Sequence, residues 1–447
     1  MLNIPSRLRK REDPIRVGVI GAGLFGTKLV DQIERASGMR TAAIADIDPD
    51  QAMGTFREAT VDPDEVTEVD GSAGIDTVIE EGNRAYVSDG LALARSDVDV
   101  VVEATGVPAV AAHHAYTAIT EGTHVVMVTV EADTVVGPTL AGVADNAGVT
   151  YSMAYGDQPA LLAEMYDWAE MVGLDVVAAG KGNPFLEEYR YGTPDDVFER
   201  FGFDPEFVEE HNLNPRMYNS FLDGTKVAVE MCAVANATGL DPDVPGMHLP
   251  AASVPEIPDT FRPEADGGIL NGSGIVDTVS SLRPDGTEVE DDIAYGVWIV
   301  TTTPNEQVQE YLEQNSGSGL YVSDDGTYQV FHRPYHLPGV ETGVSIASAA
   351  IRNEPTGVPR ERVAEVVGRA KRDLEPGDEL DGGGGYTVYG FLERAEAASE
   401  RDHVPFELLD GAEVVSTIET DEIIGYEDVD LDPDSFLYRL RRLQDAV

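Results

Sequence analysis

The chain has 447 residues, of which 42% are hydrophobic, and its formal net charge is −52. The length predicts about three domains with ordinary hydrophobic cores. The negative charge argues against nucleic acid and anionic membrane surfaces as partners, because both would repel the protein. No apolar run approaches the roughly twenty residues that span a bilayer. The single cysteine excludes a disulfide within the chain, and we therefore expect a cytoplasmic protein.

Acidic residues are spread along the whole chain, whereas lysine is nearly absent. The lysines are Lys10, Lys28, Lys181, Lys226 and Lys371. Dispersed acid with little lysine is typical of proteins from extreme halophiles, in which high salt screens the repulsion between like charges. The composition therefore predicts a halophilic protein whose stability depends on salt.

A strand–turn–helix pattern near the start carries the clearest functional signal. Residues 1–14 are expected to form an N-terminal extension, and residues 15–20 read as a buried strand. A Gly-x-Gly-x-x-Gly turn and an amphipathic helix follow. Such a turn lets the backbone approach a pyrophosphate, and the helix N-terminus offers N–H groups to it. We expect the cofactor to contact Gly21, Gly23, Leu24, Phe25 and Gly26.

The next expected strand, residues 41–45, ends at Asp46, twenty residues after Gly26. An acidic residue at this place accepts the ribose hydroxyls of NAD and repels the 2′-phosphate of NADP. We therefore expect NAD, with NADP as the alternative. A purely structural glycine turn is the competing interpretation, but it does not account for strand, turn, helix, strand and acid in this order.

Strands and helices continue to alternate to about residue 152, which predicts a parallel sheet. The strand at 99–103 ends in Ala104, Thr105 and Gly106. Ligands bind at the carboxyl ends of such strands, so we expect these three residues at the cofactor site. Glu131 and Asp133 follow the next strand, near the expected nicotinamide, and are predicted to bind substrate hydroxyls or a divalent metal.

Changes of composition after Ser152 and near residue 361 divide the rest of the chain. The predicted fold class is α/β, with a Rossmann-type domain, an α+β catalytic domain and a small β-rich C-terminal module. The expected boundaries are 15–155 for the NAD(P)-binding domain, 156–360 for the catalytic domain and 361–447 for the module.

A dehydrogenase needs a group that takes the hydroxyl proton as hydride leaves, and a lysine with a lowered pKa can do this. Lys181 lies in a glycine turn, and Lys226 lies on an expected helix over 221–237. Spacings of three and four residues would put Asp223, Lys226 and Glu230 on one helix face. We predict catalytic roles for Lys226, Asp223 and Lys181. The alternative is that they form surface ion pairs with the abundant acid.

Two further side chains are candidate substrate ligands. Asp157 and His336 both lie in expected turns, where His336 can contact a phosphate or carboxylate, although a turn histidine is often structural. Glu131, Asp157 and Asp223 also offer oxygen ligands, so binding of a divalent metal is an alternative role for these carboxylates. No His/Cys cluster has the spacing of a zinc site, and no metal ligand is assigned.

Several motifs, in order, resemble one family. The first domain resembles the NAD(P)-binding half of homoserine dehydrogenase and dihydrodipicolinate reductase. A broader resemblance, to the homoserine dehydrogenase-like oxidoreductases with a C-terminal SAF domain, rests on residues 130–138, 156–159, 179–182, 221–226 and 333–337. Residues 370–376 and 421–429 resemble the two ends of the SAF module.

The resemblance implies an NAD(P)-dependent enzyme that acts on a CH–OH group of a small polar sugar-derived or hydroxy-acid substrate. The family includes 1-deoxyxylulose-phosphate reductoisomerase-like enzymes and apionate oxidoisomerases, which couple hydride transfer to a skeletal rearrangement. By similarity to homoserine dehydrogenases, Asp223 and Lys226 correspond to a catalytic pair, although the local spacing differs. A homo-oligomer is expected. True homoserine dehydrogenase and an NAD(H)-bound sensor or small-ligand binding protein are the alternatives.

Overall fold

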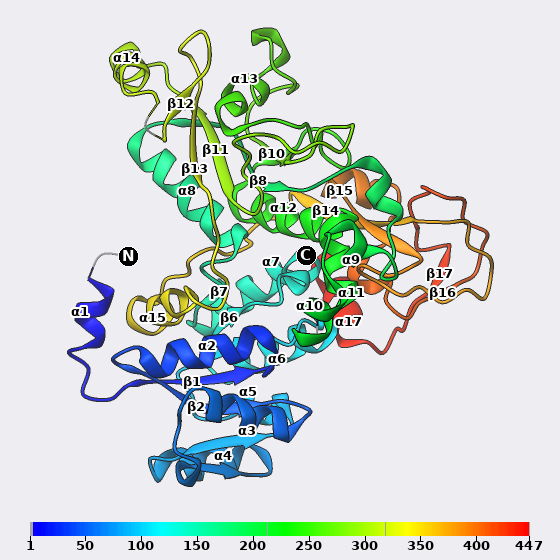
Figure 1. The fold of residues 1–447 in the computed structure, drawn as a ribbon. Coiled ribbons are helices and arrows are strands. Elements are labelled where there is room, and N and C mark those ends of the chain that lie inside the picture. Colours follow the sequence, from blue (N-terminus) through cyan, green and yellow to red (C-terminus); the bar gives the residue numbers. More distant parts are fainter. Residues whose placement is uncertain (1–2, 212, 318, 447) are drawn as a thin grey trace. The chain divides into compact units, whose positions relative to one another are not determined.

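The computed structural model describes residues 3–211, 213–317 and 319–446 (Figure 1). The chain forms two compact units, each built from separate segments. The first comprises 1–161, 337–360 and 434–447, and the second comprises 162–336 and 361–433. The predicted domains, at 15–155, 156–360 and 361–447, are each a single continuous segment, unlike these two units. Their boundaries stay predictions. None of the described helices combines the length and the hydrophobicity that a membrane span needs.

The first unit is built on a seven-stranded sheet in the order β3-β4-β2-β1-β5-β6-β7. Every strand pair in it is parallel, which confirms the predicted α/β class with a Rossmann-type sheet. The strands are β1 Ile15–Ile20, β2 Met39–Ala45, β3 Val66–Glu68, β4 Arg84–Val87, β5 Val100–Glu103, β6 His124–Met127 and β7 Tyr151–Met153. The central strands are buried on both faces and accordingly read as continuous apolar runs.

The helices of the first unit come from both ends of the chain. They are α1 Ile4–Leu8, α2 Leu24–Arg35, α3 Pro49–Glu58, α4 Gly71–Glu80, α5 Gly90–Ala94, α6 Pro108–Thr120, α7 Val130–Ala147, α15 Gly343–Arg352 and α17 Phe436–Ala446. The last helix, α17, packs on α6 and α7 (Figure 1). There the amide oxygen of Gln444 accepts a hydrogen bond of 3.1 Å from the backbone N–H of Thr139.

The second unit contains a six-stranded mixed sheet in the order β12-β13-β11-β8-β10-β9. Its strands are β8 Asp175–Asn183, β9 Asp241–Pro242, β10 Ile275–Ser280, β11 Val297–Thr302, β12 Tyr321–Val322 and β13 Gln329–Arg333. Strand β8 runs parallel to β10 and antiparallel to β11. The associated helices are α8 Gln158–Val172, α9 Val197–Arg200, α10 Pro205–Glu210, α11 Pro215–Leu222, α12 Thr225–Thr238, α13 Ile257–Thr260 and α14 Glu306–Gln314.

A C-terminal hairpin covers one side of α12 in the second unit. Strands β14, Ala364–Ala370, and β15, Val388–Arg394, pair antiparallel. The backbone N–H of Gly390 donates to Thr225 Oγ1 at 2.9 Å, which ties β15 to the start of α12. The hairpin is followed by α16 Ala395–Glu400 and by a second antiparallel pair, β16 Glu413–Val414 with β17 Val429–Asp430. Short 3₁₀ helices occupy Pro63–Glu65, Glu187–Tyr191, Val254–Glu256, Glu264–Asp266 and Phe406–Leu408.

Candidate functional site

In the glycine turn between β1 and α2, some glycines are required by the backbone conformation and another leaves space for a ligand. Gly21 has a φ of +99°, which favours glycine. A Cβ at Gly26 would lie 2.0 Å from the carbonyl oxygen of Gly21, so only glycine lets helix and turn approach this closely. A Cβ at Gly23, in contrast, would meet no protein atom within 4 Å. The N-cap of α2 is therefore open, and it fits the pyrophosphate of a dinucleotide.

Asp46 is held beside this turn by two backbone N–H groups. Its Oδ2 accepts from Ala22 at 2.7 Å, and its Oδ1 accepts from Asp48 at 2.9 Å. Each carboxylate oxygen has a second lone pair, which a ribose hydroxyl can use. The next side chain, Ile47, is 93% exposed and offers no cation to a 2′-phosphate. The residues present therefore fit a nicotinamide dinucleotide, as the sequence predicts.

A buried carboxylate organises the end of β5. Glu103 is fully buried and accepts hydrogen bonds from Thr105 Oγ1 at 2.7 Å and Thr129 Oγ1 at 2.5 Å. Thr129 Oγ1 in turn accepts from the backbone N–H of Gly106 at 3.0 Å. The predicted residues Ala104, Thr105 and Gly106 thus lie in a fixed turn at the carboxyl edge. The sequence predicts no role for Glu103, although a single acid in an apolar strand is a signal of a buried polar contact.

The start of α7 holds a second buried acid. Glu131, a predicted substrate ligand, is half-buried in the first turn. Asp133 is buried, and its Oδ1 accepts from the hydroxyl of Tyr151. Its Oδ2 has no hydrogen-bond partner among the described residues. Burial raises the pKa of Asp133 to about 7, although the Tyr151 hydrogen bond acts in the opposite direction. The role predicted for Asp133 together with Glu131, as a ligand of substrate hydroxyls or a divalent metal, stays a prediction, and the hydrogen bond from Tyr151 was not predicted.

The other predicted substrate ligands lie in different units. Asp157 is half-buried in the first unit, and its Oδ1 accepts from the backbone N–H of Gln158 at 3.0 Å. His336 lies in the second unit, where its Nδ1 is 2.7 Å from the carbonyl oxygen of Tyr295. Because a carbonyl only accepts, Nδ1 carries the proton. The roles of Glu131, Asp157 and His336 remain predictions.

In the second unit, a buried ion pair joins β8 to α12. The Lys181 ammonium donates to Glu230, and both side chains are about 97% buried. Lys226 lies one turn before Glu230 on the same helix and is half-buried. Residues four apart lie on the same side of a helix, so Lys226 shares a helix face with Glu230.

Asp223 does not belong to that helix face, and the predicted single helix over 221–237 is wrong. Helix α11 ends at Leu222, and Gly224, with a φ of +89°, separates it from α12. Asp223 is buried between them, where its Oδ2 accepts from Lys371 Nζ at 2.8 Å and its Oδ1 from the Thr225 N–H at 2.9 Å. A left-handed glycine redirects the chain, which a helical periodicity does not reveal.

Lys371 satisfies all three of its ammonium donors inside the protein. Besides Asp223, it donates to the carbonyl oxygens of Gly192 and Gly385, each at 2.8 Å. The sequence predicted no role for Lys371, although lysines are so rare in this chain that each of them is a candidate. Asp223 is therefore held by a buried cation. Among the described residues, no group of three or more His, Cys, Asp or Glu side chains is placed to hold a metal ion.

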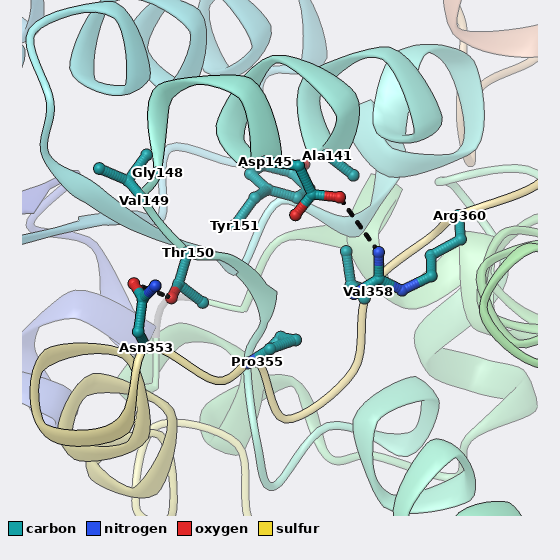
Figure 2. A pocket seen from close by; sticks show the side chains of 10 residues that line it. All are labelled: Ala141, Asp145, Gly148, Val149, Thr150, Tyr151, Asn353, Pro355, Val358 and Arg360. Atoms are coloured by element: carbon teal, nitrogen blue, oxygen red, sulfur yellow. Dashed lines mark hydrogen bonds and ion pairs between the residues drawn. The ribbon is translucent and has the colours of Figure 1, made fainter.

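Figure 2 shows a surface pocket of the first unit, lined by residues of α7, of the segment that leads into β7 and of 353–360. It is bordered by an ion pair of 3.2 Å between Asp145 and Arg360, and by a hydrogen bond of 3.2 Å between Thr150 and Asn353. Thr150 precedes β7, so the pocket lies at the amino end of that strand. Cofactors of open α/β sheets bind at the carboxyl ends, and the pocket is therefore not part of the candidate site.

Two family models match the chain. One, described as the NAD binding domain of homoserine dehydrogenase, matches residues 21–154, and the other, described as the catalytic domain of oxidoreductase DRL, matches residues 156–342. No curated protein gives a significant match.

Three solved structures illustrate the structural likeness. A probable dehydrogenase from Thermotoga maritima has a TM-score of 0.39 and 12% identity, over 76% of this chain and 90% of that one. A putative myo-inositol dehydrogenase from Sinorhizobium meliloti has a TM-score of 0.39 and 13% identity, over 76% and 90%. The 1-deoxy-D-xylulose 5-phosphate reductoisomerase from Zymomonas mobilis, in complex with NADPH, has a TM-score of 0.33 and 15% identity, over 50% and 58%.

Proposed function

Because the chain belongs to the homoserine dehydrogenase-like NAD(P)-dependent oxidoreductases, we propose that it transfers hydride to or from a hydroxyl-bearing carbon of a small sugar-derived or hydroxy-acid substrate. The family matches confirm the predicted NAD(P)-dependent enzyme acting on CH–OH groups. The observation that carries the finer proposal is the buried ion pair of Lys181 and Glu230 within the matched catalytic domain, with Lys226 one turn before Glu230 on α12.

For the cofactor we propose NAD, with NADP as the alternative. When bound, the nicotinamide supplies or accepts the hydride. Gly23 leaves room for the pyrophosphate at the start of α2, and the fixed carboxylate of Asp46 accepts from the ribose. A 2′-phosphate beside Asp46 would be repelled, and Ile47 offers it no compensating charge.

Lys226 is the proposed general base for oxidation and general acid for reduction. It lies in the first turn of α12 and is half-buried. Lys181 balances the buried charge of Glu230, which lies one turn further along α12. Lys181 is therefore proposed as a positioning residue. Asp223 keeps its place at the start of α12 through Lys371.

An isomerisation before the reduction is the finer form of this proposal, and the resemblance to reductoisomerase-like enzymes supports it. Residues 361–447 are proposed to be the SAF-like module, and we propose a homo-oligomer. A divalent metal is left open, because Asp223 belongs to the second unit and Glu131 and Asp157 to the first. No step is therefore assigned to a metal.

A substrate screen tests the proposal. The purified protein is incubated with a panel of polyols, aldonic acids, hydroxy acids and homoserine, with NAD and with NADP, and the fluorescence of the reduced cofactor is followed. We expect NAD-linked oxidation of a sugar-derived or hydroxy acid. Turnover of homoserine alone would make the protein a true homoserine dehydrogenase. Cofactor binding without turnover of any compound would favour a sensor and contradict the proposal.

A further inference from the structure

The strand order of the first unit sets the direction in which a dinucleotide lies. Strands β2, β3 and β4 lie on one side of β1, and β5, β6 and β7 lie on the other. A dinucleotide crosses the carboxyl edge of such a sheet at the strand where the order reverses, with one half on each side. Asp46, directly after β2, is the proposed ligand of the adenosine ribose. The turns after β5 and β6 therefore face the nicotinamide half.

The turn after β5 packs against the glycine turn and leaves space beside it. The backbone N–H of Ala104 donates to the carbonyl oxygen of Ile20 at 2.8 Å. A Cβ at Gly21 would lie only 2.5 Å from the carbonyl oxygen of Ala104. Gly106 has a φ of +68°, and a Cβ there would meet no protein atom within 4 Å. The turn is therefore in close contact with the protein at Ala104 and open at Gly106.

Glu103, the last residue of β5, is hydrogen-bonded to both turns. Its side chain is fully buried. Oε1 accepts from Thr105 Oγ1 at 2.7 Å, in the turn after β5, and Oε2 accepts from Thr129 Oγ1 at 2.5 Å, in the turn between β6 and α7. Nδ1 of His114, on α6, lies 3.3 Å from Oε1. Three donors from three different segments thus converge on one buried carboxylate.

Thr129 connects the two turns directly. Its hydroxyl donates to Glu103 and accepts from the backbone N–H of Gly106 at 3.0 Å. Hydrogen bonds to an ionised carboxylate are stronger than those between neutral groups, and a buried carboxylate that lost them would be costly. The spacing of the turns after β5 and β6 is therefore fixed by Glu103 through Thr129, in addition to the pairing of the two strands.

We propose that Glu103 is a positioning residue for the nicotinamide half of the cofactor. Through Thr105 and Thr129 it fixes the two turns that this half contacts, and it touches no ligand itself because it is fully buried. The proposal rests on the proposed function in one respect, namely that the cofactor is a nicotinamide dinucleotide. The adenosine half is held at Asp46 and at the start of α2, and its binding does not depend on Glu103.

Calorimetric titration of the full-length protein with NADH and with ADP tests the proposal, because ADP lacks the nicotinamide and its ribose. In Glu103→Gln an amide N–H replaces one acceptor oxygen, so one of the two threonine hydroxyls loses its acceptor. We expect the Kd of NADH to rise about tenfold and the Kd of ADP to stay within about twofold. Glu121→Gln, at an exposed glutamate after α6, should change neither Kd.

Equal weakening of NADH and ADP in Glu103→Gln, or no weakening of NADH, would overturn the proposal. The titration needs no turnover. A substrate screen without any product would therefore contradict the proposed function and leave this result to stand by itself.

Two variants of Thr129 separate the hydrogen bond from packing. Thr129→Val removes the hydroxyl at nearly constant volume, whereas Thr129→Ser keeps it. We expect Thr129→Val to repeat the selective loss of NADH affinity and Thr129→Ser to bind NADH like wild type. If Thr129→Ser were weakened as much as Thr129→Val, packing would be responsible and the proposal would be overturned. If Glu103→Gln does not fold, the comparison of Thr129→Val with Thr129→Ser decides.

Discussion

The burial of Asp133 predicts that the stability of the protein depends on pH. Its pKa is raised to about 7 from an ordinary value of 3.8, chiefly by burial. The folded protein therefore keeps this proton at pH values where the unfolded chain loses it. The contribution of Asp133 to the free energy of unfolding is fully present below about pH 4 and is lost as the pH rises through about 7. The loss amounts to at most about 4 kcal/mol.

Asp133→Asn should remove this loss, because an amide oxygen still accepts from Tyr151 and carries no charge. We expect the variant to gain stability relative to wild type at about pH 8 and much less at about pH 5, as measured by urea unfolding. Asp145→Asn is the matched control, because Asp145 lies on the same helix and its side chain is 67% exposed. An equal effect at both pH values would contradict the assigned burial.

Among individual residues, the sequence predicted positions that follow from local motifs, but it did not predict ion pairs between residues far apart in the chain. The place of Asp46 beside the glycine turn was predictable, because it directly follows the second strand. The partner of Asp223 was not, because Lys371 is 148 residues away and no local spacing reveals such a pair. The scarcity of lysine drew attention to Lys181 and Lys226, and the same argument, applied consistently, would have included Lys371.

At the scale of elements, two glycines of the β1–α2 turn should behave differently. A Cβ at Gly23 meets no protein atom within 4 Å, whereas a Cβ at Gly26 meets the Gly21 carbonyl at 2.0 Å. Gly23→Ala should leave the melting temperature of the cofactor-free protein nearly unchanged and weaken NAD binding by calorimetry. Gly26→Ala should lower the melting temperature itself. If Gly23→Ala binds NAD like wild type, the pyrophosphate does not lie at this turn.

The junction of α11, α12 and β14 depends on the pair of Asp223 and Lys371. Both side chains are almost completely buried. Lys371→Met leaves a buried carboxylate without its counter-charge, which typically costs about 3–5 kcal/mol. Urea unfolding should show this loss, and the double variant with Asp223→Asn should recover part of it. Lys10→Met, at an exposed lysine, is the control. A loss no larger than that of Lys10→Met would show that the pair is not buried as described.

The elements of the first unit were predictable because each follows a local pattern. The strand, glycine turn and helix at its start appear where the sequence places them. The single helix over 221–237 was wrong because Gly224 adopts a left-handed conformation inside an otherwise helical pattern. Sequence periodicity records which faces are apolar, but it does not record one residue of reversed φ.

At the scale of the whole molecule, charge should govern stability. The chain has 82 acidic and 30 basic residues, and its carboxylates repel one another in dilute buffer. The Debye length falls from about 30 Å at 0.01 M salt to about 3 Å at 1 M, so molar salt removes most of this repulsion. We expect the melting temperature to rise from about 0.1 M to about 3 M KCl. A flat or falling melting temperature over this range would contradict the halophilic interpretation.

The architecture of the whole chain was predictable only in part. Alternating strands and helices predicted the parallel sheet, because each strand is apolar and each helix amphipathic. The return of α17 to the first unit was not predicted, since its contacts with α7 join residues about 300 apart, as in the bond of Thr139 and Gln444. Such contacts depend on the assembled surface rather than on local sequence.

The central claim is that Lys226 transfers the proton that accompanies hydride transfer, and single-turnover kinetics of Lys226→Met test it most directly. On the best substrate of the screen, we expect the rate of the hydride-transfer step to fall about 10²–10⁴-fold, with little change in the Kd of the cofactor. Lys10→Met should react like wild type. A Lys226→Met enzyme whose hydride-transfer rate stays within about tenfold of wild type would contradict the account.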